Sequence, residues 1–262
     1  MALRLFVTGG TGTIGRHLVR MLHQDPRVSK LSCSKADVTN SKAIHEEVQS
    51  AGEIDIVIHL AALVPVKAVN LNPASAYSIN VGGTANLLCA LASNKCRFIY
   101  CSSAHVYAPS SDPISEEDKP LPGTLYGQTK LMGERIAQDV CSSKGWPLCI
   151  ARVFSIHDPN QAGSFLRPSL ERRLASHPNG EQFEITEGDS IRDFLTAEDA
   201  AHLLLKLALN DFQGIVNVAS GKPQTVSDFA KSLSSSPLNV RSTGQAQHLY
   251  ANIDRLYTAL GD

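Results

Sequence analysis

The sequence has no excess of charge of either sign and no dense run of basic residues. Its 24 Lys and Arg against 25 Asp and Glu give a formal net charge of −1 at pH 7. Proteins that bind nucleic acid capture the phosphate backbone with clustered Lys and Arg. The composition therefore gives no support for a nucleic-acid partner.

Long apolar runs are also missing. The run Leu3–Val7 is too short to span a bilayer and lacks the cleavage pattern of a signal peptide. No later run reaches the roughly 18 apolar residues that a membrane-spanning helix needs. We therefore expect no membrane partner, and a cytoplasmic protein.

The cysteines form no Cys-x-x-Cys pair and lie mostly inside apolar stretches. This usage is typical of buried thiols in a reducing compartment, so we expect neither a disulfide nor a metal site. The six positions are Cys33, Cys89, Cys96, Cys101, Cys141 and Cys149.

Apolar runs of strand length alternate with segments of helical period over the first 153 residues. This rhythm predicts an α/β fold, a Rossmann-type doubly wound parallel sheet with right-handed crossovers. The expected strands are Leu3–Thr8, Ile54–Leu60, Arg97–Ser102 and Leu148–Val153, and the helices Arg16–Leu22, Ser75–Ala92 and Leu125–Ser142.

The rhythm loosens after residue 154, which predicts a small C-terminal substrate lobe. We expect residues 1–153 to form a dinucleotide-binding domain, with 191–218 contributing a strand, the helix Ala197–Leu209 and a second strand. Residues 154–190 and 219–262 are then expected to form the lobe.

A glycine-rich loop, Thr8–Gly15, follows the first predicted strand and leads directly into a helix. Three glycines spaced three apart permit a tight turn, a close approach of pyrophosphate to the backbone, and close packing of helix on strand. Free amides at the helix N-terminus then meet the phosphate charge. This context predicts a cofactor site formed by Gly9, Gly12, Thr13, Ile14 and Gly15.

The second strand ends at Leu31–Lys35 without the carboxylate that usually binds the adenosine ribose hydroxyls. Ser34 and Lys35 can instead bind a phosphate. The sequence therefore slightly favours NADP(H) over NAD(H). In the alternative interpretation, Lys35 is only a solvated surface charge.

Tyr126 and Lys130 lie four residues apart at the start of a predicted helix and so share one face. A nearby ammonium and an oxidised nicotinamide ring both favour phenolate, which lets the tyrosine act as acid or base. The segment Tyr100–Tyr107 runs from a strand into small hydroxyl residues, where Ser103 is the expected donor to a reacting carbonyl oxygen. Ser102 is the competing candidate, and either serine could merely cap a turn.

The order of these motifs resembles that of the NAD-dependent epimerase/dehydratase family of extended short-chain dehydrogenases/reductases over nearly the whole chain. The matching segments are Thr8–Gly15, Asp37, His59–Ala62, Asn80–Thr84, Ser102–Tyr107, Tyr126–Lys130, Arg192–Phe194 and Asn217–Gly221.

The resemblance implies that Asp37 contacts the adenine amino group, and hence that the chain is shortened between the second and third strands. It also implies further cofactor contacts and three substrate contacts. The cofactor contacts are Val38, Leu60, Ala61, Ala62, Asn80 near the nicotinamide ribose, Tyr126, Lys130 and Val153, and the substrate contacts are Ser103, Ser155 and Arg192.

By the same resemblance, Arg192 grips the diphosphate of a nucleotide sugar, since a guanidinium binds oxygens in pairs. A surface ion pair with Asp193 is the alternative. Ser155 stands where the family often carries an asparagine that touches substrate. Family members commonly dimerise through helices equivalent to Ser75–Ala92 and Leu125–Ser142, so a homodimer is expected.

Dehydration is disfavoured because Ala104 and His105 stand where the family's dehydratases carry a glutamate. The shortened segment and the missing ribose acid favour a reductase of 4-keto nucleotide sugars. The Ser-Ala-x-Val-Tyr pattern resembles the 4-epimerases, which retain NAD. A non-catalytic dinucleotide sensor or scaffold is a third alternative, and loss of Tyr126 or Lys130 would favour it. Both residues are present.

Overall fold

The computed structural model describes residues 2–178 and 180–261, and its centre is a six-stranded parallel sheet. The strand order is β2-β1-β3-β4-β5-β9. The strands are β1 (Leu3–Thr8), β2 (Val28–Cys33), β3 (Ile56–His59), β4 (Arg97–Ser103), β5 (Leu148–Val153) and β9 (Gly214–Val218). The Rossmann-type parallel sheet predicted from the sequence is confirmed.

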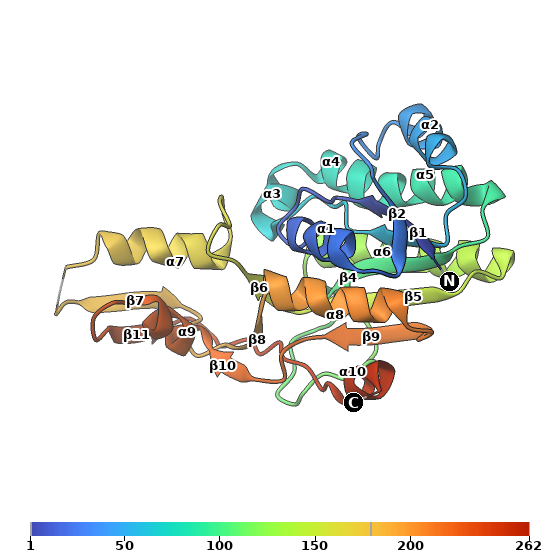
Figure 1. Ribbon diagram of the computed structural model, residues 1–262. Helices are drawn as coiled ribbons and strands as arrows, with labels where there is room; N and C mark the ends of the chain where they lie inside the picture. The colour runs from blue at the N-terminus through green and yellow to red at the C-terminus, as the bar shows by residue number, and fades with distance from the viewer. Residues whose placement is uncertain (1, 179, 262) are drawn as a thin grey trace.

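Helices cover both faces of this sheet (Figure 1). Those on one face are α1 (Gly15–Gln24) and α8 (Ala197–Leu209), and those on the other are α2 (Ser41–Ala51), α5 (Gly83–Ala90) and α6 (Leu125–Lys144). Successive side chains of a strand point to opposite faces. On β1, Leu5 and Val7 accordingly enter the core beneath α1 and α8, whereas Phe6 enters the core beneath α2 and α5.

The strand order reverses direction next to β1. The chain moves outward from β1 to β2, which is the edge strand, and then returns past β1 to β3. Between β2 and β3 the chain forms only a loop and α2, which agrees with the shortened segment that the sequence motifs imply. In sheets of this order, ligands bind outside the carboxyl ends of the strands at the switch point.

The helix expected over Ser75–Ala92 is interrupted. α3 (Val66–Leu71) and α4 (Pro73–Tyr77) lead into a π turn over Ser78–Gly82, and α5 follows at once. A π turn rotates the side chains that follow it and is common at functional sites. Here it contains the buried Asn80.

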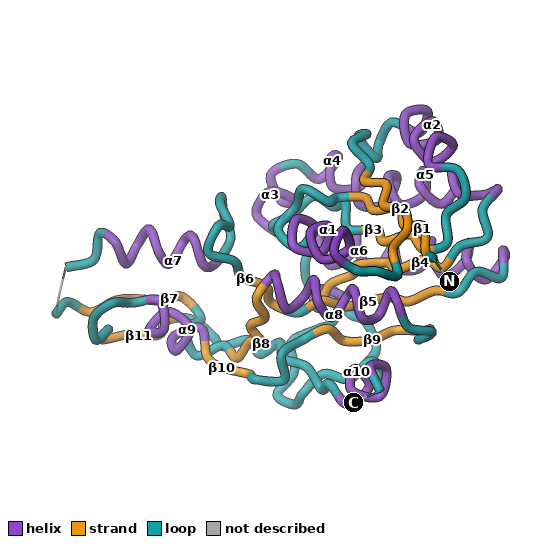
Figure 2. The backbone as a smooth tube through the Cα atoms, in the orientation of Figure 1, coloured by secondary structure: helices purple, strands orange, loops and turns teal. Residues whose placement is uncertain are grey.

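The lobe is built from two small sheets and two helices at one end of the main sheet (Figure 1). Figure 2 shows its strands and helices set apart from the helices around the main sheet. The sheets are β10-β8-β6 and β11-β7, and the elements are β6 (Ser155–His157), α7 (Leu166–Ala175), β7 (Gln182–Thr186), β8 (Ile191–Thr196), β10 (Pro223–Thr225), α9 (Val226–Leu233) and β11 (Asn239–Thr243). Phe194 and Phe229 stack in its core, with ring centroids 4.1 Å apart.

The expected division of the chain needs two corrections. Residues 191–196 form β8, which pairs with β6 and β10 of the lobe, so only α8 and β9 of the segment 191–218 join the main domain. The last helix, α10 (Asp254–Leu260), was expected in the lobe, but it packs on β9 and buries Leu256 in the main core. Within the described residues, no helix is both long and apolar enough to cross a membrane.

A buried ion pair joins α6 to the sheet. Arg152 of β5 and Glu134 of α6 each have side chains that are 2% exposed, and Arg152 Nη2 lies 2.7 Å from Glu134 Oε2. The Nε group of Arg152 donates to Oε1 of the same carboxylate at 3.0 Å, so the pair is bidentate. The Ser102 hydroxyl donates to Glu134 at 2.5 Å, and Arg152 Nη1 donates to the Tyr107 hydroxyl at 2.8 Å.

Replacing Arg152 tests how strongly this pair stabilises the fold. Arg152→Met leaves the Glu134 carboxylate buried without its cation, so we expect the free energy of unfolding to fall by about 3–5 kcal/mol. Urea denaturation measures the loss. Arg241→Met is the matched control because it breaks an exposed pair with Glu184, whose contribution should stay below about 1 kcal/mol. Equal losses in the two variants would contradict the prediction.

Candidate active site

The glycine loop after β1 leaves no room for side chains. Gly9 has a φ of 71°, and a Cβ placed on it would lie 2.6 Å from the backbone nitrogen of Ala61. A Cβ on Gly15 would lie 2.1 Å from the carbonyl oxygen of Gly9. The first turn of α1 carries no acidic residue, and no side chain caps it. The loop and the amides near Thr13 and Ile14 therefore fit a dinucleotide pyrophosphate.

The loop after β2 holds a carboxylate that the sequence did not predict there. Glu47 of α2 accepts hydrogen bonds from the Ser34 hydroxyl at 2.5 Å and from the amides of Lys35 and Ala36, both at 3.0 Å. The expectation of NADP(H) rested on the absence of a carboxylate here, and that premise is wrong. This carboxylate comes from a helix 12 to 13 residues further along the chain.

Asp37 and Val38 follow in the same loop. Asp37 is exposed, and its carboxylate accepts two hydrogen bonds from Thr39, which lower its pKa. Val38 is buried against Gly83, where a Cβ would lie 2.5 Å from its Cγ2 atom. The loop is thus anchored to α5, with Asp37 facing solvent, where an adenine could reach it.

A directional chain of hydrogen bonds joins β1 to α5 beneath the loop after β3. The Thr84 hydroxyl donates to the carbonyl of Asn80 at 2.8 Å, so it accepts from His59 Nε2 at 3.0 Å. His59 Nδ1 then accepts from the Thr8 hydroxyl at 2.6 Å, which itself accepts from the amide of Ala61 at 3.4 Å. Burial, with a smaller effect of the Lys130 charge, lowers the pKa of His59 to about 3, so the ring is neutral.

Asn80 links the loop after β3 to α6. Its side-chain oxygen accepts from the amide of Leu63 at 2.7 Å, and its nitrogen donates to the Thr129 hydroxyl at 3.0 Å. Thr129 donates in turn to the carbonyl of Tyr126 at 2.8 Å. Because Asn80 is 1% exposed and bound on both sides, its geometry indicates a positioning role toward Tyr126.

Tyr126 and Lys130 lie on the first turns of α6, which begins after the capping residue Thr124. Gly127 allows this start because a Cβ there would lie 2.0 Å from the carbonyl oxygen of His105. Lys130 is 2% exposed, and its ammonium lies 4.4 Å from the centroid of the Tyr100 ring. This cation–π contact holds the charge in place beside the partly buried Tyr126.

Burial raises the pKa of Tyr126, and the Lys130 charge and a hydrogen bond with Ser103 offset the rise only in part. The residue is therefore a phenol at neutral pH. Ser103 also accepts from the amide of His105 at 3.3 Å, so it caps the 3-10 turn Ala104–Val106 as well as facing Tyr126. Ser102 instead donates to Glu134. The geometry thus favours Ser103 over Ser102 as the reacting hydroxyl.

His105 lies against Tyr126, and Arg192 lies close enough to His105 for its charge to affect that ring. The His105 ring meets the Tyr126 ring edge-on with centroids 5.7 Å apart. Burial, and next the Arg192 charge, lower the pKa of His105 to about 4, so this histidine is neutral at pH 7. The alternative assignment of Arg192 to an ion pair with Asp193 is not supported, because Asp193 accepts from Ser220 and Gly221. Arg192 donates to the carbonyls of Ile191 and Gln247.

The other predicted cofactor and substrate residues lie at the carboxyl edge of the sheet. Leu60, Ala61 and Ala62 follow β3 directly, and Val153 ends β5. Ser155 begins β6, where it pairs with Phe194 of β8 at the junction with the lobe.

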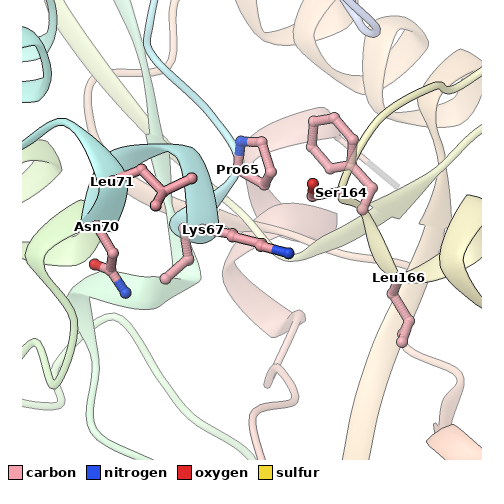
Figure 3. Close-up of a pocket in the computed structure, with 8 residues that line it drawn as sticks. Pro65, Lys67, Asn70, Leu71, Ser164 and Leu166 are labelled. Atoms are coloured by element: carbon pink, nitrogen blue, oxygen red, sulfur yellow. The ribbon is translucent and has the colours of Figure 1, made fainter.

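A cavity of about 560 Å³ opens between α3 and the segment before α7 (Figure 3). The Lys67 side chain extends into it from α3 toward Ser164. Its size lies within the range of small-molecule sites. Neither Tyr126 nor Arg192 lines it. In residues 2–178 and 180–261, no group of three or more His, Cys, Asp and Glu is placed to hold a metal ion.

Sequence reasoning missed the supporting residues Tyr100, Thr129, Glu134 and Arg152. Two of them left a signal. Arg152 is the one charge in the apolar run Leu148–Val153, and Glu134 lies four residues after Lys130 on the same helix face. Nothing in the sequence distinguished Glu47 from its neighbour Glu46.

The fold is a parallel sheet whose strand order reverses next to β1. A glycine loop lies at its carboxyl edge, with a tyrosine–lysine pair nearby. These features define the nicotinamide-dependent oxidoreductases of the short-chain type. The sequence model of the NAD dependent epimerase/dehydratase family matches residues 5–219. The chain belongs to this family and is an NAD(P)-dependent enzyme of its extended short-chain dehydrogenase/reductase type.

Individual relatives include both reductases and epimerases. The chain is 33% identical over 247 residues to GDP-6-deoxy-D-mannose reductase of Pseudomonas aeruginosa, covering 89% of this chain and 80% of the relative. It is 30% identical over 277 residues to UDP-glucose 4-epimerase of Dictyostelium discoideum, covering 88% and 80%. Among solved structures, RMD from Pseudomonas aeruginosa complexed with NADPH superposes with a TM-score of 0.86 at 28% identity, covering 99% of this chain and 92% of that one.

The neutral state of His59 predicts a pH dependence of stability. The folded pKa of about 3 lies below the 6.5 that is ordinary for a histidine, so between these values the unfolded chain binds a proton that the folded chain does not. The free energy of unfolding should therefore fall with decreasing pH, by about 1.4 kcal/mol per pH unit from this residue. In His59→Gln, the slope between about pH 6 and pH 4 should be smaller by that amount.

Urea denaturation at a series of pH values measures both slopes. His202→Gln, at an exposed position of α8, is the matched control and should keep the slope of the wild type. An unchanged slope in His59→Gln would show that His59 is not held neutral.

Proposed function

We propose that this enzyme is a reductase that transfers a hydride to C4 of a 4-keto nucleotide sugar. The observation that carries the proposal is a Tyr126 phenol that hydrogen bonds to Ser103 beside the buried Lys130 cation, with no carboxylate at positions 104 and 105. A protonated tyrosine suits the reductive direction, in which the carbonyl oxygen gains a proton. The similarity to a sugar reductase supports the same direction.

The residues divide the reaction between them. The bound nicotinamide supplies the hydride. Ser103 donates a hydrogen bond to the C4 oxygen, and Tyr126 transfers its phenolic proton to that oxygen as the hydride reaches C4, so a ketone becomes a secondary alcohol. Lys130 then stabilises the tyrosinate that remains. Solvent returns the proton before the next turnover. Dehydration requires a base that removes a proton from carbon. Positions 104 and 105 carry no carboxylate, and His105, whose pKa is lowered to about 4, is a weak base.

Two cationic side chains support a substrate that is bound through a nucleotide diphosphate. Arg192 lies near His105, which contacts Tyr126, and its guanidinium can bind phosphate oxygens in pairs. Lys67 extends into the cavity between α3 and α7, at the junction of domain and lobe (Figure 3). We propose that the nucleotide lies along this junction and directs its sugar toward Tyr126.

A 4-epimerase with retained NAD is the second candidate. It is favoured by the Ser103-Ala-His-Val-Tyr107 pattern and by similarity to several UDP-glucose 4-epimerases. An epimerase keeps its cofactor through many turnovers, whereas a reductase exchanges it.

Cofactor turnover distinguishes the two candidates. A reductase consumes one reduced nicotinamide for each GDP- or UDP-linked 4-keto-6-deoxy sugar, which is followed by loss of nicotinamide absorbance. An epimerase interconverts 4-epimers of UDP-hexoses without net loss and is purified with NAD bound. Tyr126→Phe should lower kcat of the reductase by about 10²–10⁴-fold, because the proton donor is lost. The control Tyr257→Phe removes an exposed hydroxyl on α10 and should have full activity. Full activity in Tyr126→Phe would refute the mechanism.

The two adjacent serines predict opposite phenotypes. Ser103→Ala removes the donor to the C4 oxygen and should lower kcat by about 10²–10³-fold with little change in stability. Ser102→Ala removes a donor from the buried Glu134 and should lower the free energy of unfolding by about 1–3 kcal/mol while kcat stays close to the wild type. Steady-state kinetics and urea denaturation of both variants make the comparison. The reverse pattern would assign the reacting hydroxyl to Ser102.

A further inference from the structure

We propose that Glu47 of α2 binds the adenosine ribose and makes this enzyme select NAD(H) over NADP(H). The proposal rests on the cofactor dependence of the proposed function and not on its sugar substrate. It replaces the preference that the sequence suggested, because the carboxylate missing from the end of β2 is supplied from another element.

The position of the Glu47 carboxylate matches that of a ribose-binding acid. Ser34 continues β2, and its amide donates to the carbonyl of Val7 at 2.8 Å, which keeps the loop beside the carboxyl end of β1. A Cβ on Gly10 would lie 3.9 Å from Cys33, so the end of β2 adjoins the glycine loop. In dinucleotide folds, the acid at this place accepts the ribose hydroxyls next to the pyrophosphate.

The carboxylate is fixed before any cofactor arrives. The Ser34 hydroxyl and the amides of Lys35 and Ala36 donate to its two oxygens. A carboxylate offers about four acceptor positions, so these three bonds leave one for a ribose hydroxyl. Glu47 therefore holds the loop and still accepts a hydrogen bond from the ligand.

A phosphate on the 2′-oxygen would meet this carboxylate at close range. To bind the same three donors it would have to displace Glu47. α2 cannot move to withdraw Glu47 from the loop, because Ile44 and Val48 on either side of Glu47 are buried in the core. The displaced carboxylate would stay within a side chain's length of the phosphate, and like charges at such a distance repel. The Lys35 side chain is exposed, so its charge compensates little.

The neighbour Glu46 supplies a matched control. It carries the same charge one residue away, but it is exposed and lies 3.9 Å from Lys42 across one turn of α2. Neutralising Glu46 tests the long-range effect of one negative charge on α2. Neutralising Glu47 also removes a direct contact with the loop and the ribose.

The test is a pair of fluorescence titrations, with NADH and with NADPH, on the full chain without sugar substrate. The wild type should bind NADH at least about 10-fold more tightly than NADPH, since one charged hydrogen bond corresponds to about a 10–100-fold change in Kd. In Glu47→Gln, the ratio of the two Kd values should shift toward NADPH by about 10-fold or more, and in Glu46→Gln by less than about 2-fold.

A second variant protects the test against a folding defect. Glu47→Asp keeps the charge but shortens the reach, so both cofactors should bind more weakly and the preference for NADH should persist. Circular dichroism verifies that each variant is folded. Tighter binding of NADPH by the wild type, or an unchanged ratio in Glu47→Gln, would overturn the assignment of Glu47 while leaving the reductase proposal intact. Binding of neither cofactor by the wild type would overturn both.

Discussion

The buried pair of Arg152 and Glu134 is the constraint on which the rest of the site depends. Tyr126, Lys130 and Glu134 follow one another at intervals of four residues and so share one face of α6. Arg152 and Ser102 fix the last of the three to β5 and β4, which sets the rotation and depth of the helix. An isolated buried charge is costly, so α6 cannot slide without breaking the pair. The position of the phenol is therefore fixed by charges that take no part in the chemistry.

A second set of polar contacts holds α6 from the other side. Asn80 reaches Thr129, which is bonded to the carbonyl of Tyr126, and the chain through Thr84, His59 and Thr8 connects Asn80 to the end of β1. Each hydroxyl and ring nitrogen in this chain has a partner, so the network rigidifies the core without leaving a polar group unsatisfied. As a result, the glycine loop and the catalytic helix are parts of one framework. The groups that we propose for the chemistry are Ser103, Tyr126 and Lys130.

Elements defined by local pattern could be predicted, and those defined by distant contacts could not. The apolar runs Leu3–Thr8 and Leu148–Val153 became strands with those bounds, because a buried parallel strand needs only a short apolar run between turns. The motifs also brought Ser103, Tyr126 and Lys130 to one place. The π turn at Asn80 was missed because the contacts that hold it come from Leu63 and Thr129, and β8 was placed in the wrong sheet because its partners lie 30 residues or more away. Glu47 was missed for the same reason, since a ribose acid is expected at the end of the second strand, whereas Glu47 lies on the helix beside it.

The position of Glu47 is related to the place of β2 at the edge of the sheet. With β2 at the edge, the loop after it has no strand beside it to order its backbone amides. The amides of Lys35 and Ala36 find their acceptor in a side chain rather than in a neighbouring strand. α2 supplies one acceptor group for both, and Asn86 of α5 holds the carbonyl of Val38 at the far end of the loop. A single carboxylate thus orders the loop in the free protein and presents an oxygen toward the ribose site. An acid that is already fixed loses little conformational freedom when the ligand binds, which is the advantage of preorganisation. Because β2 is the edge strand, the ordering of the loop after it and the placing of the acid both depend on α2.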